Sequence, residues 1–144
     1  MPVSGARPKP PGQAVHRNGV VHDWTTVVNV PFKGKVPALP KLVPGADVPW
    51  PRRTRDAWAA WSRMPHCVLW SPADWSYALD TLAVAAQFHL YGEQKFATEL
   101  RNREKVLGTT FDARQGLRIR YVEPEAAPRS GGAVVTKISD YAKL

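Results

Sequence analysis

The distribution of proline divides this chain into two parts. Ten of its fourteen prolines lie within the first 53 residues. Proline fixes the backbone angle φ and has no N–H group, so a regular helix cannot continue through such a segment. Basic side chains dominate the same segment, because Asp23 and Asp47 are its only carboxylates before Trp50. Residues 1–50 are therefore predicted to form an extended, basic arm.

One stretch of the arm has a different character. Residues 23–30, Asp-Trp-Thr-Thr-Val-Val-Asn-Val, are rich in β-branched side chains, which favour strands. Pro31 follows directly and would interrupt a longer strand. Two interpretations remain open: a short strand, or an irregular segment that places its aromatic residue on a neighbouring element.

Helical signals begin near Pro51. Thr54 is a candidate N-cap, and Trp58 and Trp61 lie three residues apart, on one face of a helix that ends before Pro65. A short link then leads to a second and longer helix.

The clearest helix start in the chain is Ser71-Pro72-Ala73-Asp74. Ser71 can accept from the free N–H groups of the first turn, Pro72 suits the first helical position, and Asp74 approximates a capping box. Gly92 predicts the end of this helix. Apolar side chains recur between these signals at helical spacing, at Trp75, Leu79, Leu82, Ala86 and Leu90.

A further long helix is predicted over residues 93–107, with Gly108 closing it. Its apolar face carries Phe96, Leu100 and Leu107. Glu99 precedes Arg103 by four residues, the favourable order for an ion pair on a helix.

A third, short helix is predicted after Thr109 or Thr110, with Ala113, Leu117 and Tyr121 on one side. Beyond Pro124 the chain is rich in Ala, Pro, Gly and Ser, a composition typical of a flexible tail. The predicted fold class is mainly α. A helical hairpin core with short flanking helices occupies residues 51–121, between the basic proline-rich arm of residues 1–50 and a flexible tail of residues 122–144.

Charge indicates the kind of partner. Lys and Arg number 20 against 12 Asp and Glu, which gives a formal net charge of +8 and a pI near 10.0. Such a surplus favours a polyanion, and nucleic acid is preferred over an acidic protein or a membrane surface. The single cysteine, Cys67, excludes an intramolecular disulfide, and no run approaches the roughly 20 apolar residues that span a bilayer. We expect a cytoplasmic protein without a membrane partner.

The residue types needed for catalysis do not cluster in this sequence. Gly34-Lys35 lacks the upstream glycine and the following Ser or Thr of a phosphate-binding loop. The acids are scattered at helical positions rather than grouped for two metal ions. His66-Cys67 is the one pair with metal-ligand character, and two adjacent residues cannot complete a four-ligand site. We therefore expect no enzymatic activity, no metal and no cofactor.

Six tryptophans are many for 144 residues, and four of them fall between residues 58 and 75. Bulky rings fill a small core efficiently, which is the preferred interpretation. Tryptophan is also enriched as an anchor at subunit interfaces, and the two roles are compatible.

The ordered combination of motifs resembles the terminase small subunits of tailed phages that infect actinobacteria. The resemblance covers residues 7–121. It is carried by Arg7-Pro-Lys-Pro-Pro-Gly12 with His16-Arg17-Asn18-Gly19, by Trp50-Pro-Arg-Arg-Thr-Arg-Asp-Ala-Trp58, by Trp70-Ser-Pro-Ala-Asp-Trp75 before an Ala/Leu helix, and by Leu107-Gly-Thr-Thr-Phe-Asp-Ala-Arg114 with Leu117-Arg-Ile-Arg120.

This resemblance implies a homo-oligomer, such as a ring, of helical subunits. It also implies binding to double-stranded phage DNA and contact with the large terminase subunit, which carries the ATPase and nuclease, in the cytoplasm of the infected host. The expected oligomer-packing residues are Trp75, Leu79, Leu82, Phe96 and Leu100.

Residues 1–50 show no helix-turn-helix pattern, although some small terminases carry one there. The basic arm and the arginine-rich third helix are therefore alternative DNA-contacting elements. The residues expected to contact phosphates are Arg7, Lys9, Arg17, Lys33, Lys35, Arg114, Arg118 and Arg120. Two other functions remain open: a small DNA-binding transcriptional regulator that reads bases directly, and a virion or head-assembly structural protein.

Overall fold

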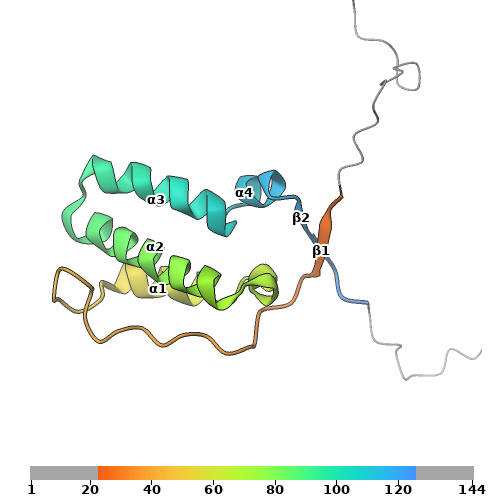
Figure 1. The fold of residues 1–144 in the computed structure, drawn as a ribbon, viewed down its shortest axis with the longest axis horizontal. Coiled ribbons are helices and arrows are strands. Elements are labelled where there is room, and N and C mark those ends of the chain that lie inside the picture. The colour runs from red at the N-terminus through yellow and green to blue at the C-terminus, as the bar shows by residue number, and fades with distance from the viewer. Residues whose placement is uncertain (1–22, 126–144) are drawn as a thin grey trace, which may run out of the picture.

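A computed structural model describes residues 23–125 of the 144. In chain order it contains strand β1 (Thr25–Val28), helix α1 (Arg52–Trp61), a 3-10 helix η1 (Pro65–Leu69), helices α2 (Pro72–Tyr91), α3 (Gln94–Leu107) and α4 (Phe111–Gly116), and strand β2 (Ile119–Val122). The mainly α fold class is confirmed. Figure 1 shows the long helices stacked side by side, with the small sheet at one end of the helical body.

The predicted hairpin of two long helices is α2 and α3. Ser71 Oγ accepts from the Asp74 N–H while the Asp74 carboxylate accepts from the Ser71 N–H, so the capping box is complete. Gly92 and Gly108 end the two helices with φ of 67° and 72°. This left-handed conformation favours glycine, which has no Cβ to clash.

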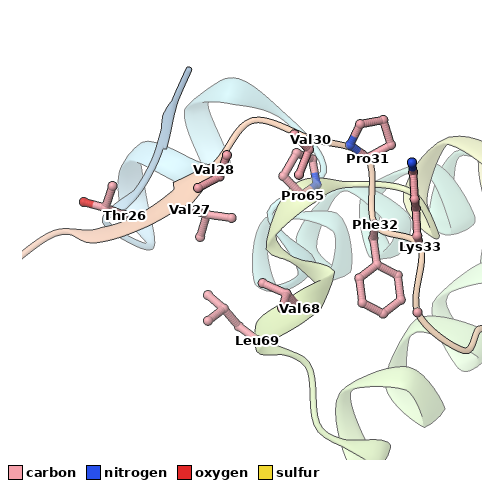
Figure 2. Close-up of a pocket in the computed structure, with 11 residues that line it drawn as sticks. Thr26, Val27, Val28, Val30, Pro31, Phe32, Lys33, Pro65, Val68 and Leu69 are labelled. Atoms are coloured by element: carbon pink, nitrogen blue, oxygen red, sulfur yellow. The ribbon is translucent and has the colours of Figure 1, made fainter. Parts of the chain in front are cut away.

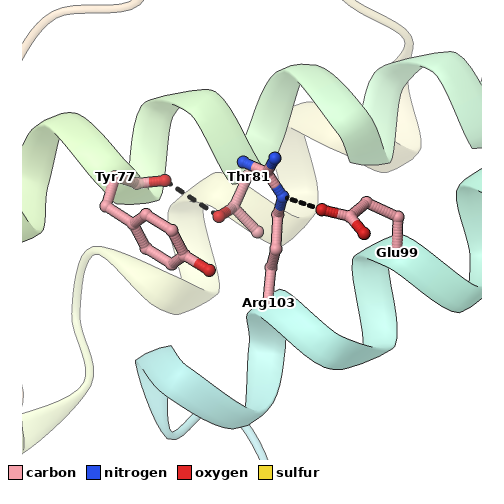
Figure 3. Close-up of polar contacts among 4 residues, drawn as sticks. All are labelled: Tyr77, Thr81, Glu99 and Arg103. Carbon is pink, nitrogen blue, oxygen red and sulfur yellow. Dashed lines mark hydrogen bonds and ion pairs between the residues drawn. The ribbon is translucent and has the colours of Figure 1, made fainter.

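Small residues of α2 are part of the core. Ala78, Ala85 and Ala86 are buried together with Leu82. A polar contact links α2 to α3 (Figure 3): Arg103 of α3 donates from Nε to Glu99, 2.6 Å away, and its guanidinium lies 5.7 Å from the centre of the Tyr77 ring on α2. The predicted Glu99–Arg103 pair is therefore confirmed, and it also joins the two helices.

Helix α1 differs from its prediction at one residue. Thr54 was expected as the N-cap, but the helix begins at Arg52, and Pro51 takes the cap position without a side-chain bond. Thr54 is fully buried inside the helix instead, and its hydroxyl shares a hydrogen bond of 2.7 Å with Nδ1 of His89 on α2. A threonine hydroxyl satisfies either role, and only the packing of α1 on α2 selects this one.

Four of the six tryptophans are buried in the core, which agrees with the interpretation preferred from the sequence. Trp58, Trp61 and Trp75 are buried, and Trp70 packs edge-on against Trp75 with ring centres 4.8 Å apart. The segment between β1 and α1 also reaches this core: Val43 is fully buried, and the indole of Trp50 donates to the Pro40 carbonyl at 2.7 Å. The extended segment is thus packed along the helices, as Figure 1 shows.

The third predicted helix is shorter than expected. It was predicted to carry Ala113, Leu117 and Tyr121 on one side, but α4 ends at Gly116 and residues 119–122 form β2. Arg118 has a φ of 56°, which interrupts the helix. The β-branched and aromatic residues that follow then pair in parallel with β1, in the register Thr25 with Ile119 to Val28 with Val122. Of the two interpretations of residues 23–30, the strand is the correct one.

Candidate nucleic-acid interface

The turn from α4 into β2 creates a small hollow at the sheet end of the molecule. It is lined by Phe111, Arg114, Gln115, Ile119, Arg120 and Tyr121. Two of the arginines expected to contact phosphates, Arg114 and Arg120, are thereby brought to one place. A continuous third helix would not have formed this hollow, because β2 must leave the helix axis in order to reach β1.

Arg114 is held in place by the fold. One of its terminal nitrogens, Nη1, donates to the carbonyls of Gly108 at 3.2 Å and Thr109 at 3.3 Å, and the guanidinium lies 5.0 Å from the centre of the Tyr121 ring. These contacts neutralise the negative end of helix α3. Arg114 therefore stabilises the fold, and its charge also faces the hollow.

Arg118 and Arg120 are exposed and make no ion pair among the described residues. The Arg120 guanidinium lies 4.9 Å from the centre of the Trp24 ring, one residue before β1. The arm of residues 1–22 joins the described fold at this same end of the sheet. Its basic residues Arg7, Lys9 and Arg17 lie outside the described residues.

Lys33 and Lys35 lie elsewhere. The two lysines follow the last residue of β1, whereas Arg118 directly precedes the first residue of β2. Because the two strands are parallel, the lysines and Arg118 lie at opposite ends of the sheet. Both lysines are exposed. Lys33 lines a separate hollow that also includes the exposed Arg63, which the sequence analysis did not single out. The five predicted basic residues that fall within residues 23–125 therefore do not gather in one patch.

Of two aromatic residues at the sheet end, Phe111 was missed by the sequence analysis, and Trp24 was considered there only as an aromatic residue that packs on a neighbouring element. Phe111 is 72% exposed at the start of α4, and Trp24 carries the Arg120 guanidinium on its ring. Phe111 is the exposed ring of the two, since Trp24 is half-buried, and exposed rings beside arginines are typical of surfaces that bind nucleic acids. The available signal was an apolar residue directly after the Thr110 cap, a position that faces solvent rather than the helical stripe.

The residues expected to pack between subunits fall into two groups. Leu82 and Trp75 are buried by the chain itself, in the core. Leu79, Phe96 and Leu100 are partly exposed. Trp75 and Leu79 also line a shallow hollow with Lys35, Pro37, Pro72 and Ser76, so part of this set still borders the surface.

A buried histidine contacts Tyr121, one of the residues that line the hollow. His66 of η1 donates from Nε2 to the Leu107 carbonyl at 2.7 Å, and its Nδ1 is hydrogen-bonded to the Tyr121 hydroxyl. Burial lowers the pKa of His66, and the nearby Arg114 charge lowers it further, against the opposing effect of the Leu107 bond. Burial also raises the pKa of Tyr121. The neutral imidazole accepts at Nδ1 and so matches both partners.

No catalytic arrangement is visible among residues 23–125. No three His, Cys, Asp or Glu side chains meet there as a metal site. Cys67 is buried, and burial raises its pKa to about 12, which keeps the thiol protonated. No helix in this part of the chain combines the length and the apolar character needed to cross a membrane.

These features define a small, basic, mainly α-helical protein whose cationic and aromatic side chains meet at one end of a helical hairpin. A family model described as phage terminase small subunit matches residues 3–144. The chain belongs to this family, and its role lies in phage genome packaging. No curated protein and no solved structure matches the chain.

Proposed function

We propose that this protein is the non-catalytic DNA-recognition and adaptor component of the packaging motor. It binds double-stranded phage DNA as a homo-oligomeric ring and regulates the large terminase subunit, in the cytoplasm of the infected host. The observation that carries the proposal is the cationic hollow at the sheet end, where Arg114 and Arg120 meet beside Phe111 and Trp24.

The charge distribution supports DNA as the ligand. Residues 1–22 carry three basic residues and no acid, and they join the fold beside Trp24 and Arg120. The arm and the β2 arginines therefore supply positive charge to one end of the subunit. Each phosphate contact releases condensed counterions, which makes such binding strongly dependent on salt.

Oligomerisation would multiply these weak contacts. Repeating one cationic end around a ring presents many copies to one DNA duplex, so that contacts add through multivalency. Leu79, Phe96 and Leu100 are the predicted packing residues that remain partly exposed, and they support an interface over the hairpin. Lys33 and Lys35 remain secondary candidates for phosphate contact.

The proposal is tested by measuring DNA affinity across a salt series. The double variant Arg118→Asn/Arg120→Gln removes two charges at the sheet end, and asparagine tolerates the left-handed backbone at residue 118. We expect weaker binding. We also expect the magnitude of the slope of log affinity against log salt to fall by about 1–2, because each lost phosphate contact removes about 0.9.

The matched control is Arg101→Gln/Lys105→Gln, which removes two exposed charges from α3. It should leave the slope almost unchanged. Equal effects of the two double variants would show that only net charge matters and would contradict an interface at the sheet end. A footprint confined to a short palindrome, with no effect on a large terminase subunit, would favour the regulator alternative instead.

A further inference from the structure

An apolar groove lies between the segment of residues 26–34 and η1 (Figure 2). Its walls carry four of the ten large hydrophobic side chains that are exposed in the described part of the chain, namely Val28, Val30, Val68 and Leu69. Val68 and Leu69 are the more exposed pair, at 64% and 52%. The groove has a volume of about 480 Å³, within the range of roughly 300–1,000 Å³ that is typical of ligand sites. Exposed apolar side chains that gather in one place mark an interaction surface.

Positive charge adjoins one end of the groove. Lys33 is the one charged residue that lines the groove, and residues 31–34 also line a second hollow, which includes Arg63. Both cations are exposed, and neither forms an ion pair within the described chain. No described Asp or Glu lines either hollow. The surface therefore combines apolar walls with two cations that have no carboxylate partner among the described residues.

The fold holds the segment that borders both hollows. Phe32 N–H donates to the Arg63 carbonyl at 3.0 Å, and the Phe32 ring packs on Trp75 with ring centres 5.7 Å apart. The ring also lies over Gly34, because a Cβ at residue 34 would overlap it. A wall held by these contacts is formed before a ligand arrives, and a preformed site has less ordering to offset on binding.

We propose that the groove docks a short segment of the large terminase subunit in which apolar side chains are followed by carboxylates. The apolar side chains of this segment pack against Val68 and Leu69, and its carboxylates pair with Lys33 and Arg63. The chemistry of the segment follows from the groove, whereas the choice of the large subunit as its source rests on the proposed function.

DNA and a second copy of the chain suit the groove less well. Phosphates need donors, and apolar walls supply none. A stable contact between copies buries about 800 Å² on each partner, and the residues proposed for that contact, Leu79, Phe96 and Leu100, belong to the helical hairpin. Lys33 and Arg118 lie at opposite ends of the sheet, so that the segment and DNA can bind the same subunit.

The test is the affinity of the full chain for the large terminase subunit of the same phage, measured by calorimetry. Val68→Ser/Leu69→Ser removes apolar area from the groove and should weaken the complex about tenfold or more, while DNA affinity stays unchanged. The matched control Tyr91→Ser/Val106→Ser removes two side chains that are 58% and 60% exposed and lie outside the groove. It should leave the affinity for the large subunit almost unchanged.

A second variant tests the charge without altering the apolar walls. Arg63→Glu should weaken the same complex about tenfold at low salt, and added salt should reduce this effect. Arg101→Glu, at an exposed residue of α3, is its control and should bind like the wild type. Unchanged binding by both groove variants would overturn the docking site and leave the proposed function intact. A wild-type chain that does not bind the large subunit would overturn both.

A photo-crosslinking amino acid in place of Val68 identifies what occupies the groove. In the mixture of the full chain, DNA and the large subunit, we expect the crosslink to join a large-subunit peptide that carries Asp or Glu close to the attachment point. A crosslink to DNA or to a second copy of the chain would assign the groove to that ligand and overturn the proposal.

Discussion

His66 is the residue through which three elements meet. It lies on η1, binds the last carbonyl of α3 and contacts the hydroxyl of Tyr121 in β2. Gly108, directly after α3, approaches the same ring, since a Cβ there would lie 3.1 Å from His66 Nε2. A buried imidazole therefore holds Tyr121, which lines the cationic hollow, although the sequence analysis considered His66 only as part of a pair that cannot complete a metal site.

His66 predicts how stability changes with pH. Its pKa is below the ordinary value of 6.5 in the folded protein, so the unfolded chain takes up the proton first. The stabilisation by neutral His66 is complete above about pH 6.5 and is lost as pH falls towards the lowered pKa. Urea unfolding between about pH 8 and 5 should show this loss.

The variant His66→Phe provides the comparison. It leaves the Leu107 carbonyl and the Tyr121 hydroxyl without their partner, so we expect a loss of about 2–4 kcal/mol at pH 8. Its stability should also decline less steeply in acid. Burial lowers the pKa of His89 as well, so His89→Gln serves as the control that retains the His66 contribution. A His66→Phe protein with the full wild-type pH dependence would contradict this role.

At the scale of elements, the hairpin is specified mainly by local signals at its ends. Ser71 and Asp74 start α2, and glycines in the left-handed conformation end α2 and α3. The two glycines have the same backbone requirement but different surroundings. A Cβ at Gly92 would meet no atom within 4 Å, whereas one at Gly108 would also lie 3.2 Å from the Leu117 side chain.

This contrast predicts unequal effects of the same substitution. Gly92→Ala should cost about 1 kcal/mol, from backbone strain alone. Gly108→Ala should cost about 2–4 kcal/mol, because strain is joined by crowding of the His66 and Leu117 side chains. The free energies of unfolding measured by chemical denaturation compare the two. Equal losses would mean that the contacts around Gly108 relax without cost.

At the scale of the whole molecule, the hairpin and the sheet divide the surface. The sheet end carries Arg118, Arg120 and the junction with the arm, while the partly exposed apolar residues of α2 and α3 lie along the helical body (Figure 1). Under the proposed function, the first region would contact DNA and the second would pack between subunits.

The proposed ring predicts a discrete solution mass of many subunits in light scattering, both with and without DNA. Leu79→Asp places a charge on the proposed packing surface and should reduce that mass, while circular dichroism remains helical. Val106→Asp, at a residue of α3 that is 60% exposed and outside the predicted set, is the matched control. A wild-type mass of one or two subunits would contradict the ring and leave DNA binding to be explained by a smaller species.

Most helix ends could be predicted because their causes are local. A serine cap, a proline at the first helical position and a glycine after the last turn act within a few residues of one another. The boundaries of α2 and the Glu99–Arg103 pair belong to this class. The preferred interpretation of the tryptophans as core also followed from their size and from the small number of residues available for burial.

The remaining features depended on partners distant in the chain. Residues 119–122 have an ambiguous local preference, and they form a strand because β1, more than ninety residues earlier, offers a parallel partner. Thr54 turns inward because His89 faces it across the core. The meeting of Arg114 and Arg120 beside Phe111 follows from the same strand pairing. Local periodicity determined the helices, whereas contacts between distant segments decided the sheet and the cationic hollow, because no short-range pattern encodes which segments will meet.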